Sequence, residues 1–342
     1  MSAVLSPPHP STSSSLVEHV REAYSVGGVE LNMDLGGTRN LTLLVTTGSG
    51  MLVVRAYGPG VALERLLAIQ SVRRALSARG VPTSVPLSTR TGQSWSRYGG
   101  RLIEVEEFVE HSARLDSWDR LERALPMLAD LHNVLRTSSM SPASKRPVAV
   151  RYPNAGEVRE WIPRVWKRLE PWPLPPEVVG FVRRAEALAH RVHELALPYR
   201  GRVPVQLVHG NFWDSSVLFR AGRVVLVGDF DFMAERPRID DLALTLYFAS
   251  STLAVNPATE KSRRRLRTFV DVYDARLDDH LTTTERRALP LAIAQIPLVV
   301  LQYIAESRRA EEVHRLVERM LPELSWSAAI VDQLEHWQEG LA

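Results

Sequence analysis

The stretch from residue 206 to residue 243 decides the fold, and it reads QLVHGNFWDSSVLFRAGRVVLVGDFDFMAERPRIDDLA. A strand-like run, Gln206 to Val208, leads into a polar loop that ends at Ser216. Two further strand-like runs, joined by a tight turn at Ala221-Gly222, then lead to an acidic loop that starts at Gly228. Because a hairpin returns the chain to the end from which it started, the polar loop and the acidic loop are expected to lie beside each other.

The two loops carry carboxylates that suit a metal ion. Asp214 belongs to the polar loop, and Asp229 and Asp231 belong to the acidic loop. Converging carboxylates repel one another unless a cation lies between them, and hard oxygen ligands suit Mg²⁺. The stretch therefore predicts a magnesium site at this end of the hairpin.

The block resembles the aminoglycoside phosphotransferase and choline kinase family, whose members are relatives of protein kinases. The catalytic loop of that family reads His-Gly-Asp, then four residues, then Asn. Its metal loop has an Asp before a large apolar residue, and a later Asp-Leu-Ala supports the catalytic loop. The matching residues here are His209-Gly210-Asn211, Ser216, Asp229-Phe230-Asp231 and Asp241-Leu242-Ala243. The order and spacing agree from about Leu35 onward. The resemblance implies an α+β, bilobal, protein-kinase-like fold with a small antiparallel-sheet N-lobe and a larger, mainly helical C-lobe.

Two positions depart from the family pattern. Asn211 replaces the Asp that accepts or orients the proton of the substrate hydroxyl, and Ser216 replaces the metal-binding Asn. An amide is no general base, and general-base help is worth about 10²–10⁴ in rate. Phosphoryl transfer depends mainly on positioning and charge neutralisation, so a slower reaction is compatible with the loss. Asp214 is a replacement base if the loop turns it inward. Asp229 is the main expected metal ligand, with Ser216 and Asp231 beside it.

Three residues near this block are expected to support it. His209 is predicted to hold the catalytic loop through hydrogen bonds, and Asp241 to be a buried, paired anchor for that loop. His132 is interpreted as a packed helix histidine and not as a base. Two larger groups stay open between a substrate site and an ordinary role, the carboxylates Asp271, Asp274, Asp278 and Asp279 and the indoles Trp161, Trp166, Trp172 and Trp213.

The N-terminal part predicts a small sheet with one helix. Leu41–Val45 and Met51–Tyr57 form a hairpin signal around Gly48-Ser49-Gly50. Leu63 to Leu76 has apolar residues at helical spacing. Strands are expected again near residues 94–98 and 101–109.

The resemblance assigns the nucleotide to this sheet. The expected contacts are Gly36, Gly37, Asn40, Arg55, Glu106 and Phe108. Arg55 takes the place of the family's phosphate-binding Lys, with Glu64 as its candidate helix partner, and residues 106–109 take the place of the inter-lobe hinge that meets adenine. The alternatives are a simple turn at the glycines and an exposed strand arginine at position 55. ATP or GTP and Mg²⁺ are the cofactors that the resemblance implies.

Composition and organisation limit the remaining possibilities. The 342 residues carry a net charge of +3 and no cysteine, which argues against nucleic acid as a partner and excludes thiolate chemistry. We expect a disordered tail over residues 1–15, an N-lobe over 16–108 and a C-lobe over 109–342. The uncharged run from Ala288 to Ala305 is expected to be a buried helix kinked near Pro297, so no membrane span is predicted and a cytoplasmic location is expected.

Two functions follow from the sequence. The first is a nucleotide-dependent kinase that phosphorylates a hydroxyl of a small molecule, such as an antibiotic, or of a modified peptide. The second is a pseudokinase that binds or scaffolds a partner protein in a biosynthetic complex, and Asn211 and Ser216 together favour it. A single chain does not distinguish natural divergence at Asn211 from a deliberate replacement of the Asp.

Overall fold

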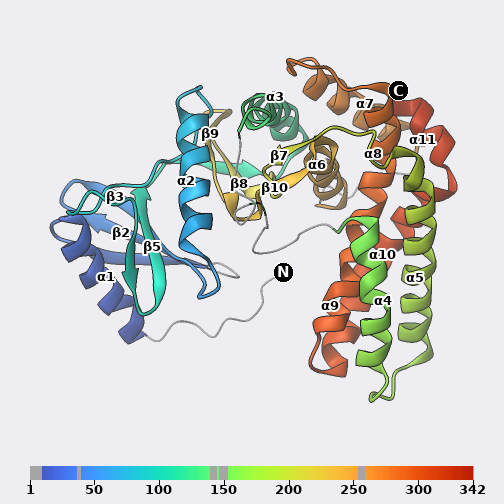
Figure 1. Ribbon diagram of the computed structural model, residues 1–342, viewed down its shortest axis with the longest axis horizontal. Coiled ribbons are helices and arrows are strands. Elements are labelled where there is room, and N and C mark those ends of the chain that lie inside the picture. Colours follow the sequence, from blue (N-terminus) through green and yellow to red (C-terminus); the bar gives the residue numbers. More distant parts are fainter. Residues whose placement is uncertain (1–9, 37–39, 139–144, 146–152, 253–258, 342) are drawn as a thin grey trace. The chain divides into compact units, whose positions relative to one another are not determined.

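The computed structural model describes residues 10–36, 40–138, 145, 153–252 and 259–341. The chain divides into two compact units (Figure 1). The N-terminal unit is built mainly from residues before 114 together with residues 218–228, and the C-terminal unit from most of the other residues. A small sheet unit followed by a larger helical unit confirms the predicted α+β architecture.

A five-stranded antiparallel sheet forms the frame of the N-terminal unit, in the spatial order β1-β2-β3-β5-β4. Its strands are β1 (Glu30–Gly36), β2 (Leu41–Thr47), β3 (Gly50–Ala56), β4 (Ser96–Tyr98) and β5 (Arg101–Glu107). The strands β2 and β3 are the predicted hairpin. The pairing of β3 with β5 places Arg55 opposite Glu104, which brings charged positions of two strands together.

Two helices, α1 (Pro10–Tyr24) and α2 (Leu63–Ser77), pack on this sheet from opposite sides (Figure 1). Alternation along β5 explains this arrangement, because Ile103 and Val105 join the core under α1, whereas Leu102 packs with Leu66 of α2. Every residue of β5 between its two ends is therefore buried.

Helix α1 corrects one prediction. Residues 10–15, expected to belong to a disordered tail, lie in this helix, and residues 1–9 fall outside the described part. The physical reason is that Leu16, Val20 and Tyr24, each four residues apart, form a buried stripe against the sheet. The sequence analysis considered the Ser- and Pro-rich beginning of this segment and not its apolar end.

The C-terminal unit is mainly helical. Its helices are α3 (Trp118–Leu135), α4 (Ala155–Leu169), α5 (Pro176–Ala196), α6 (Arg238–Thr252), α7 (Glu260–Asp274), α8 (Thr283–Gln295), α9 (Val300–Glu306), α10 (Ala310–Asp332) and α11 (Leu334–Leu341), with short 3₁₀ turns η2 (Leu197–Tyr199), η3 (Phe230–Phe232) and η4 (Ile296–Val299). Asn154 and Glu157 form a capping box at the start of α4, which explains why the helix begins there.

Two short sheets carry the predicted loops. Strand β7 (Val205–Val208) pairs antiparallel with β10 (Ala234–Pro237), and β6 (Ala113–Leu115), β8 (Asp214–Arg220) and β9 (Arg223–Val227) form a three-stranded sheet. Because Val208 lies opposite Ala234, the residues that follow β7 and those that precede β10 meet at one end of the ladder. Strand β10 was not predicted, because its residues Ala-Glu-Arg-Pro show no apolar alternation.

The uncharged run is interrupted at Pro297 as predicted. Helix α8 ends at Gln295, η4 contains Pro297, and α9 continues the chain. Within the described residues, Thr283–Glu306 is the one helical stretch long and apolar enough to cross a membrane, and 83% of its most apolar window is buried inside the structure. Its hydrophobicity is explained by packing in the core of the C-terminal unit.

Candidate active site

The polar loop and the acidic loop of the C-terminal unit meet at the side chain of Asn211. Its Nδ2 atom donates one hydrogen bond to Ser216 Oγ, at 2.8 Å, and another to a carboxylate oxygen of Asp229. Asn211 and Ser216 are both buried. The structure thus brings together three residues, from the loops before and after the hairpin, that the sequence predicts to lie in one site.

Asp241, a buried carboxylate in the first turn of α6, holds the polar loop through hydrogen bonds from the loop's backbone. Asp241 Oδ2 accepts from the backbone N–H of His209 at 2.6 Å, and Oδ1 accepts from the N–H of Gly210 at 2.7 Å. His132 Nε2 lies 3.1 Å from Asp241 Oδ2, and its Nδ1 lies 2.6 Å from the hydroxyl of Tyr273. Asp241 and His132 therefore support the loop, in agreement with their expected roles.

His209 closes the loop on itself. Its Nδ1 accepts from the backbone N–H of Asn211 at 3.1 Å, and its ring is fully buried against Phe212 and Phe230. A ring that accepts a hydrogen bond from the next-but-one residue fixes the direction of the Asn211 backbone. This is the holding role expected for His209.

Gly210 is required at its position by a close backbone approach. Its φ is +78°, and a Cβ atom there would lie 2.4 Å from the carbonyl oxygen of Phe232 in η3. Any other residue would push η3 away from the polar loop. The glycine therefore allows the polar and acidic loops to touch.

Both loop aspartates have backbone conformations that are uncommon for a residue with a side chain. Asp229 has φ 61° and ψ 51°, and Asp214 has φ 47°. Such conformations persist where the surrounding structure imposes them, and they cluster at functional sites. At Asp229 the left-handed turn lets the chain pass from β9 directly into η3.

The expected metal ligands are arranged only in part as predicted. Ser216 Oγ and a carboxylate oxygen of Asp229 lie around one amide nitrogen, so two oxygen donors are available at one place. Within the described residues, no three His, Asp or Glu side chains lie close enough together to hold a metal. Asp214, Asp229 and Asp231 therefore do not form the converging carboxylate group that the sequence suggested.

Asp214 is engaged elsewhere. Arg114 Nε, on β6, lies 3.1 Å from Asp214 Oδ1 in a pair that is largely open to solvent. The expectation that Asp214 turns inward to replace the missing base is not met. The reason is local, because the left-handed backbone at Asp214 begins β8 and directs the side chain to the neighbouring strand.

In the N-terminal unit, the predicted nucleotide residues are mostly tied to their own fold. The N–H of Gly36 donates to Asp34 Oδ1 at 2.8 Å, and Asn40 Oδ1 accepts from the N–H of Gly58 at 3.1 Å. The N–H of Phe108 donates to Met51 O at 3.0 Å. Gly37 lies outside the described residues.

The side chain of Glu106 belongs to a buried ion-pair cluster, while the contact of its backbone with adenine stays a prediction. Its side chain is buried and forms an ion pair with Arg73 of α2, and its other oxygen lies 3.8 Å from Arg55. Alternation in β5 explains this, because Glu104 and Glu106 share the face toward α2. Arg73 and Glu104 are not among the predicted site residues, although two glutamates at alternate positions of an apolar strand are a usable signal.

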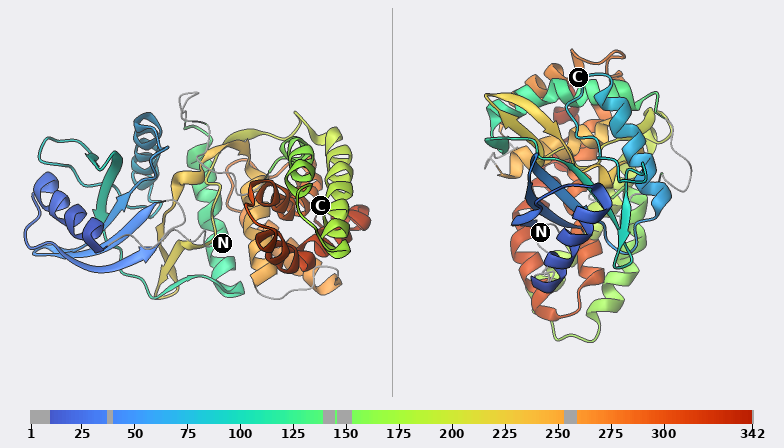
Figure 2. Two further views of the ribbon diagram at one scale, coloured as in Figure 1. Left: turned by 90° about the horizontal axis from the view of Figure 1, so that it is seen from below. Right: turned by 90° about the vertical axis from the view of Figure 1, so that its left-hand side faces the viewer.

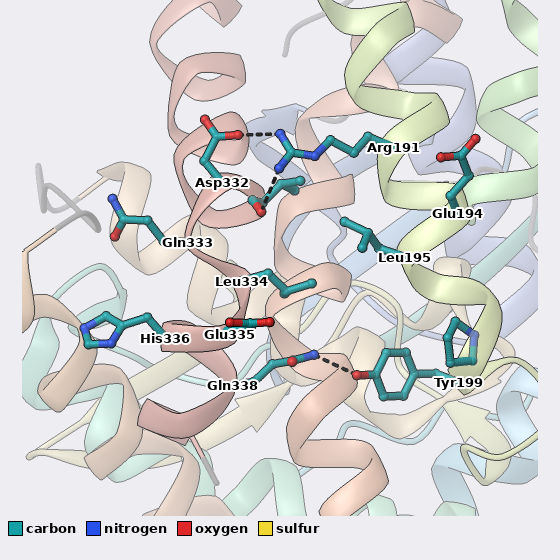
Figure 3. Close-up of a pocket in the computed structure, with 12 residues that line it drawn as sticks. Arg191, Glu194, Leu195, Tyr199, Asp332, Gln333, Leu334, Glu335, His336 and Gln338 are labelled. Carbon is teal, nitrogen blue, oxygen red and sulfur yellow. Dashed lines mark hydrogen bonds and ion pairs between the residues drawn. The ribbon is translucent and has the colours of Figure 1, made fainter.

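Cavities in the C-terminal unit are lined by other residues. An open hollow of about 820 Å³ lies where the end of α5 meets the α10–α11 junction (Figure 3). There Gln338 donates to the Tyr199 hydroxyl at 2.7 Å, and Arg191 pairs with Asp332 (Figure 3). No residue of the predicted active site lines this hollow.

Of the two groups that the sequence left open, three of the four carboxylates are ion-paired. Asp271 and Asp274 pair with Arg286, and Asp279 pairs with Arg136. The four indoles are not gathered in one site. Trp213 stacks on Phe248, Trp161 is buried, and Trp166 and Trp172 line a separate surface hollow at the end of α4.

Comparison with known proteins identifies the family of this site. The sequence model of the phosphotransferase enzyme family, APH, matches residues 33–282, which is most of the chain. The chain belongs to this family. Its members are kinase-like phosphotransferases of small molecules, and the match includes all the residues gathered around Asn211.

Curated relatives of the chain include homoserine kinases. Those of Phenylobacterium zucineum and Methylobacterium nodulans are 24% and 25% identical over 217 and 231 residues. The first match spans 61% of this chain and 61% of the relative, and the second spans 65% of each. The chain therefore matches less than two thirds of the length of these relatives.

Solved structures share the fold over nearly the whole chain. A microcompartment-associated aminopropanol kinase has a TM-score of 0.69 at 17% identity, with 96% of this chain and 99% of that chain covered. An amicoumacin kinase in complex with AMP-PNP and Ca²⁺ has a TM-score of 0.67 at 13% identity, with 94% and 93% covered. A choline kinase from Cryptosporidium parvum has a TM-score of 0.61 at 13% identity, with 94% and 97% covered.

Proposed function

We propose that this chain is a nucleotide-dependent kinase that transfers a phosphoryl group to a hydroxyl of a small amino alcohol. The observation that carries the proposal is the contact of Asn211 with both Ser216 and Asp229, since it joins the expected catalytic and metal loops at one place. Family membership supports the same reaction class.

Asn211 is proposed to orient the acceptor hydroxyl. Its Nδ2 hydrogens are directed to Ser216 and Asp229, which leaves Oδ1 to accept a hydrogen bond from the incoming hydroxyl. This positions the nucleophile without removing its proton, and positioning is the larger part of catalysis in phosphoryl transfer. We expect turnover below that of an enzyme with a carboxylate at this position, by about 10²–10⁴.

Asp229 and Ser216 are the residues that would hold Mg²⁺. They supply a carboxylate and a hydroxyl oxygen at one place, which fits an ion that takes few protein ligands and completes its shell with phosphate oxygens and water. When bound, Mg²⁺ neutralises the charge that develops on the transferred phosphoryl group. Arg55 is proposed to pair with the nucleotide phosphates, and ATP or GTP serves as donor.

The names of the relatives support the proposed acceptor class. The curated relatives are homoserine kinases, and the structures of similar fold include an aminopropanol kinase, a choline kinase and an ethanolamine kinase. All four names denote compounds with a hydroxyl and an amine or ammonium on a short chain. Antibiotics and modified peptides are the larger alternatives, because an amicoumacin kinase and a spectinomycin phosphotransferase also share the fold.

A pseudokinase is the second candidate, and a specific observation favours it. The amide of Asn211 already satisfies both expected metal ligands, so the two loops are held together by the protein itself. A binding subunit needs this closed arrangement and no turnover. Its partner would then be another protein of a biosynthetic complex.

Turnover with homoserine, aminopropanol, choline and ethanolamine tests the two candidates. ATP or GTP and Mg²⁺ are supplied, and product formation is followed by ³¹P NMR for the unmodified chain and for the double variant Asn211→Asp/Ser216→Asn. We expect slow transfer to one acceptor by the unmodified chain and a faster rate in the double variant. Ser215→Asn is the matched control, because Ser215 is the exposed neighbour of Ser216.

Each outcome selects one candidate. Turnover by the unmodified chain supports the kinase. Nucleotide binding without turnover, together with turnover gained only in the double variant, supports the pseudokinase. Absence of nucleotide binding in both proteins would rule out the kinase proposal.

A further inference from the structure

The pairing of Arg55 differs from what the family pattern implied. The expected partner, Glu64, lies exposed in the first turn of α2. A carboxylate of β5 forms an ion pair with Arg55, since Glu106 Oε1 lies 3.8 Å from a guanidinium nitrogen of Arg55. The strand that carries the cation and the strand that carries the carboxylate are hydrogen-bonded neighbours.

Arg73 fixes this carboxylate from the helix side. One terminal nitrogen donates to Glu104 at 2.5 Å, the other donates to Glu106, and Nε donates to the carbonyl oxygen of Ser84 at 2.8 Å. The side chains of Arg73, Glu104 and Glu106 are all less than a tenth exposed. Helix α2 therefore contributes a cation to the cluster, where the family pattern places a carboxylate.

Glu106 divides its two oxygens between two arginines. Oε2 accepts from Arg73 and from the Ser84 hydroxyl, the latter at 2.7 Å, and Oε1 faces Arg55. Burial by itself would raise the pKa of Glu106, but the charges of Arg73 and Arg55 and the Ser84 hydrogen bond hold that pKa below its ordinary value. The carboxylate is thus ionised at neutral pH and links α2 to β3.

We infer that Glu106 is the positioning residue for Arg55 and that it takes the role which the family pattern gives to a helix glutamate. The inference rests on the proposed function, in which Arg55 contacts the nucleotide phosphates. Glu106 balances the charge of Arg55 on its inner side. Its side chain remains 19% exposed, which leaves an outer part to meet a phosphate.

The test compares the preference of the protein for ATP over AMP among matched variants. Arg55→Ala, Glu106→Gln and Glu104→Gln are measured by competition against a fluorescent ATP analogue in the presence of Mg²⁺. We expect Arg55→Ala and Glu106→Gln each to lower the ATP-to-AMP preference roughly tenfold, the size of one charge-assisted contact. The double variant should lose no more than either single variant, because both changes act on one contact.

Glu104→Gln is the control for a purely structural role. Glu104 pairs with the same Arg73 as Glu106 does. It lies opposite Arg55 in the strand register, whereas the ion pair with Arg55 is made by Glu106. We expect a comparable loss of thermal stability with an unchanged ATP-to-AMP preference.

Other results separate the inference from the proposed function. If Arg55→Ala lowers the preference and Glu106→Gln leaves it unchanged or raises it, the positioning role is wrong while the kinase proposal stands. An equal loss in Glu104→Gln also overturns the role, because the effect is then one of stability. If Arg55→Ala has no effect, or the unmodified chain binds no nucleotide, the phosphate role of Arg55 fails first.

Discussion

Two buried carboxylates, Asp241 in the C-terminal unit and Glu106 in the N-terminal unit, are held in opposite ways. Asp241 accepts from two backbone N–H groups and faces the ring of His132. Glu106 is held by the guanidinium groups of Arg73 and Arg55 and by one hydroxyl. The first carboxylate is bound to the backbone of a loop, and the second is bound to side-chain charges.

These two ways of holding a carboxylate predict which substitutions each position tolerates. Backbone donors stay in place whatever the sequence, so a residue at position 241 must always supply acceptors to the loop. Side-chain charges can be removed together, and a buried ion cluster that is replaced as a whole costs little. We therefore expect Asp241 to be irreplaceable for the fold and the cluster of Glu104, Glu106 and Arg73 to be replaceable as a unit.

The largest effect is expected for Asp241→Asn. The substitution keeps the shape but turns one acceptor into a donor that faces a backbone N–H, within a fully buried site. Unsatisfied buried donors cost about 1–3 kcal/mol each, so a loss of about 3–5 kcal/mol in the free energy of unfolding is expected. Urea denaturation measures it. A loss below 1 kcal/mol, roughly the value of one ordinary hydrogen bond, would contradict the anchoring role.

In the cluster of Arg73, Glu104 and Glu106, we expect a loss of stability that two further substitutions largely restore. Arg73→Met leaves Glu104 and Glu106 without their shared partner, and breaking a buried pair in this way costs roughly 3 kcal/mol. The triple variant Arg73→Met/Glu104→Gln/Glu106→Gln removes the stranded charges and should recover most of the loss. Guanidinium denaturation compares the two proteins, and a triple variant no more stable than Arg73→Met would refute the contrast with Asp241.

The sequence predicted the parts of the site that depend on order and spacing. Hairpin geometry was enough to place Asn211 beside Asp229, and the Asp-Leu-Ala pattern was enough to make Asp241 an anchor. Side-chain direction was harder, because it depends on register between strands distant in sequence. The side chain of Glu106 pairs with Arg73 of α2, and Asp214, a replacement base only if its loop turned inward, pairs with Arg114.

The last prediction concerns Asp240, the sequence neighbour of Asp241. Asp240 is buried, with Arg236 4.0 Å away, and it lines a cavity of about 370 Å³. Burial raises the pKa of Asp240 to about 7, against the lowering effect of Arg236 and with further raising by Asp241 and Glu157. At a pH between these two pKa values, Asp240 is protonated in the folded protein, whereas in the unfolded chain, with its ordinary pKa of 3.8, it has lost the proton.

The sign of the pH dependence follows from this proton. Between about pH 4 and pH 7 the folded state binds more protons at position 240 than the unfolded state, so its contribution to stability falls as the pH rises. Asp240→Asn removes the penalty, and because a shift of roughly three pKa units is worth about 4 kcal/mol, we expect a gain of about that size at pH 8 and little change at pH 4. Urea denaturation at both pH values measures the difference. The same isosteric change at adjacent positions should thus stabilise the protein at 240 and destabilise it at 241, and destabilisation at both positions would show that Asp240 is also held by the loop.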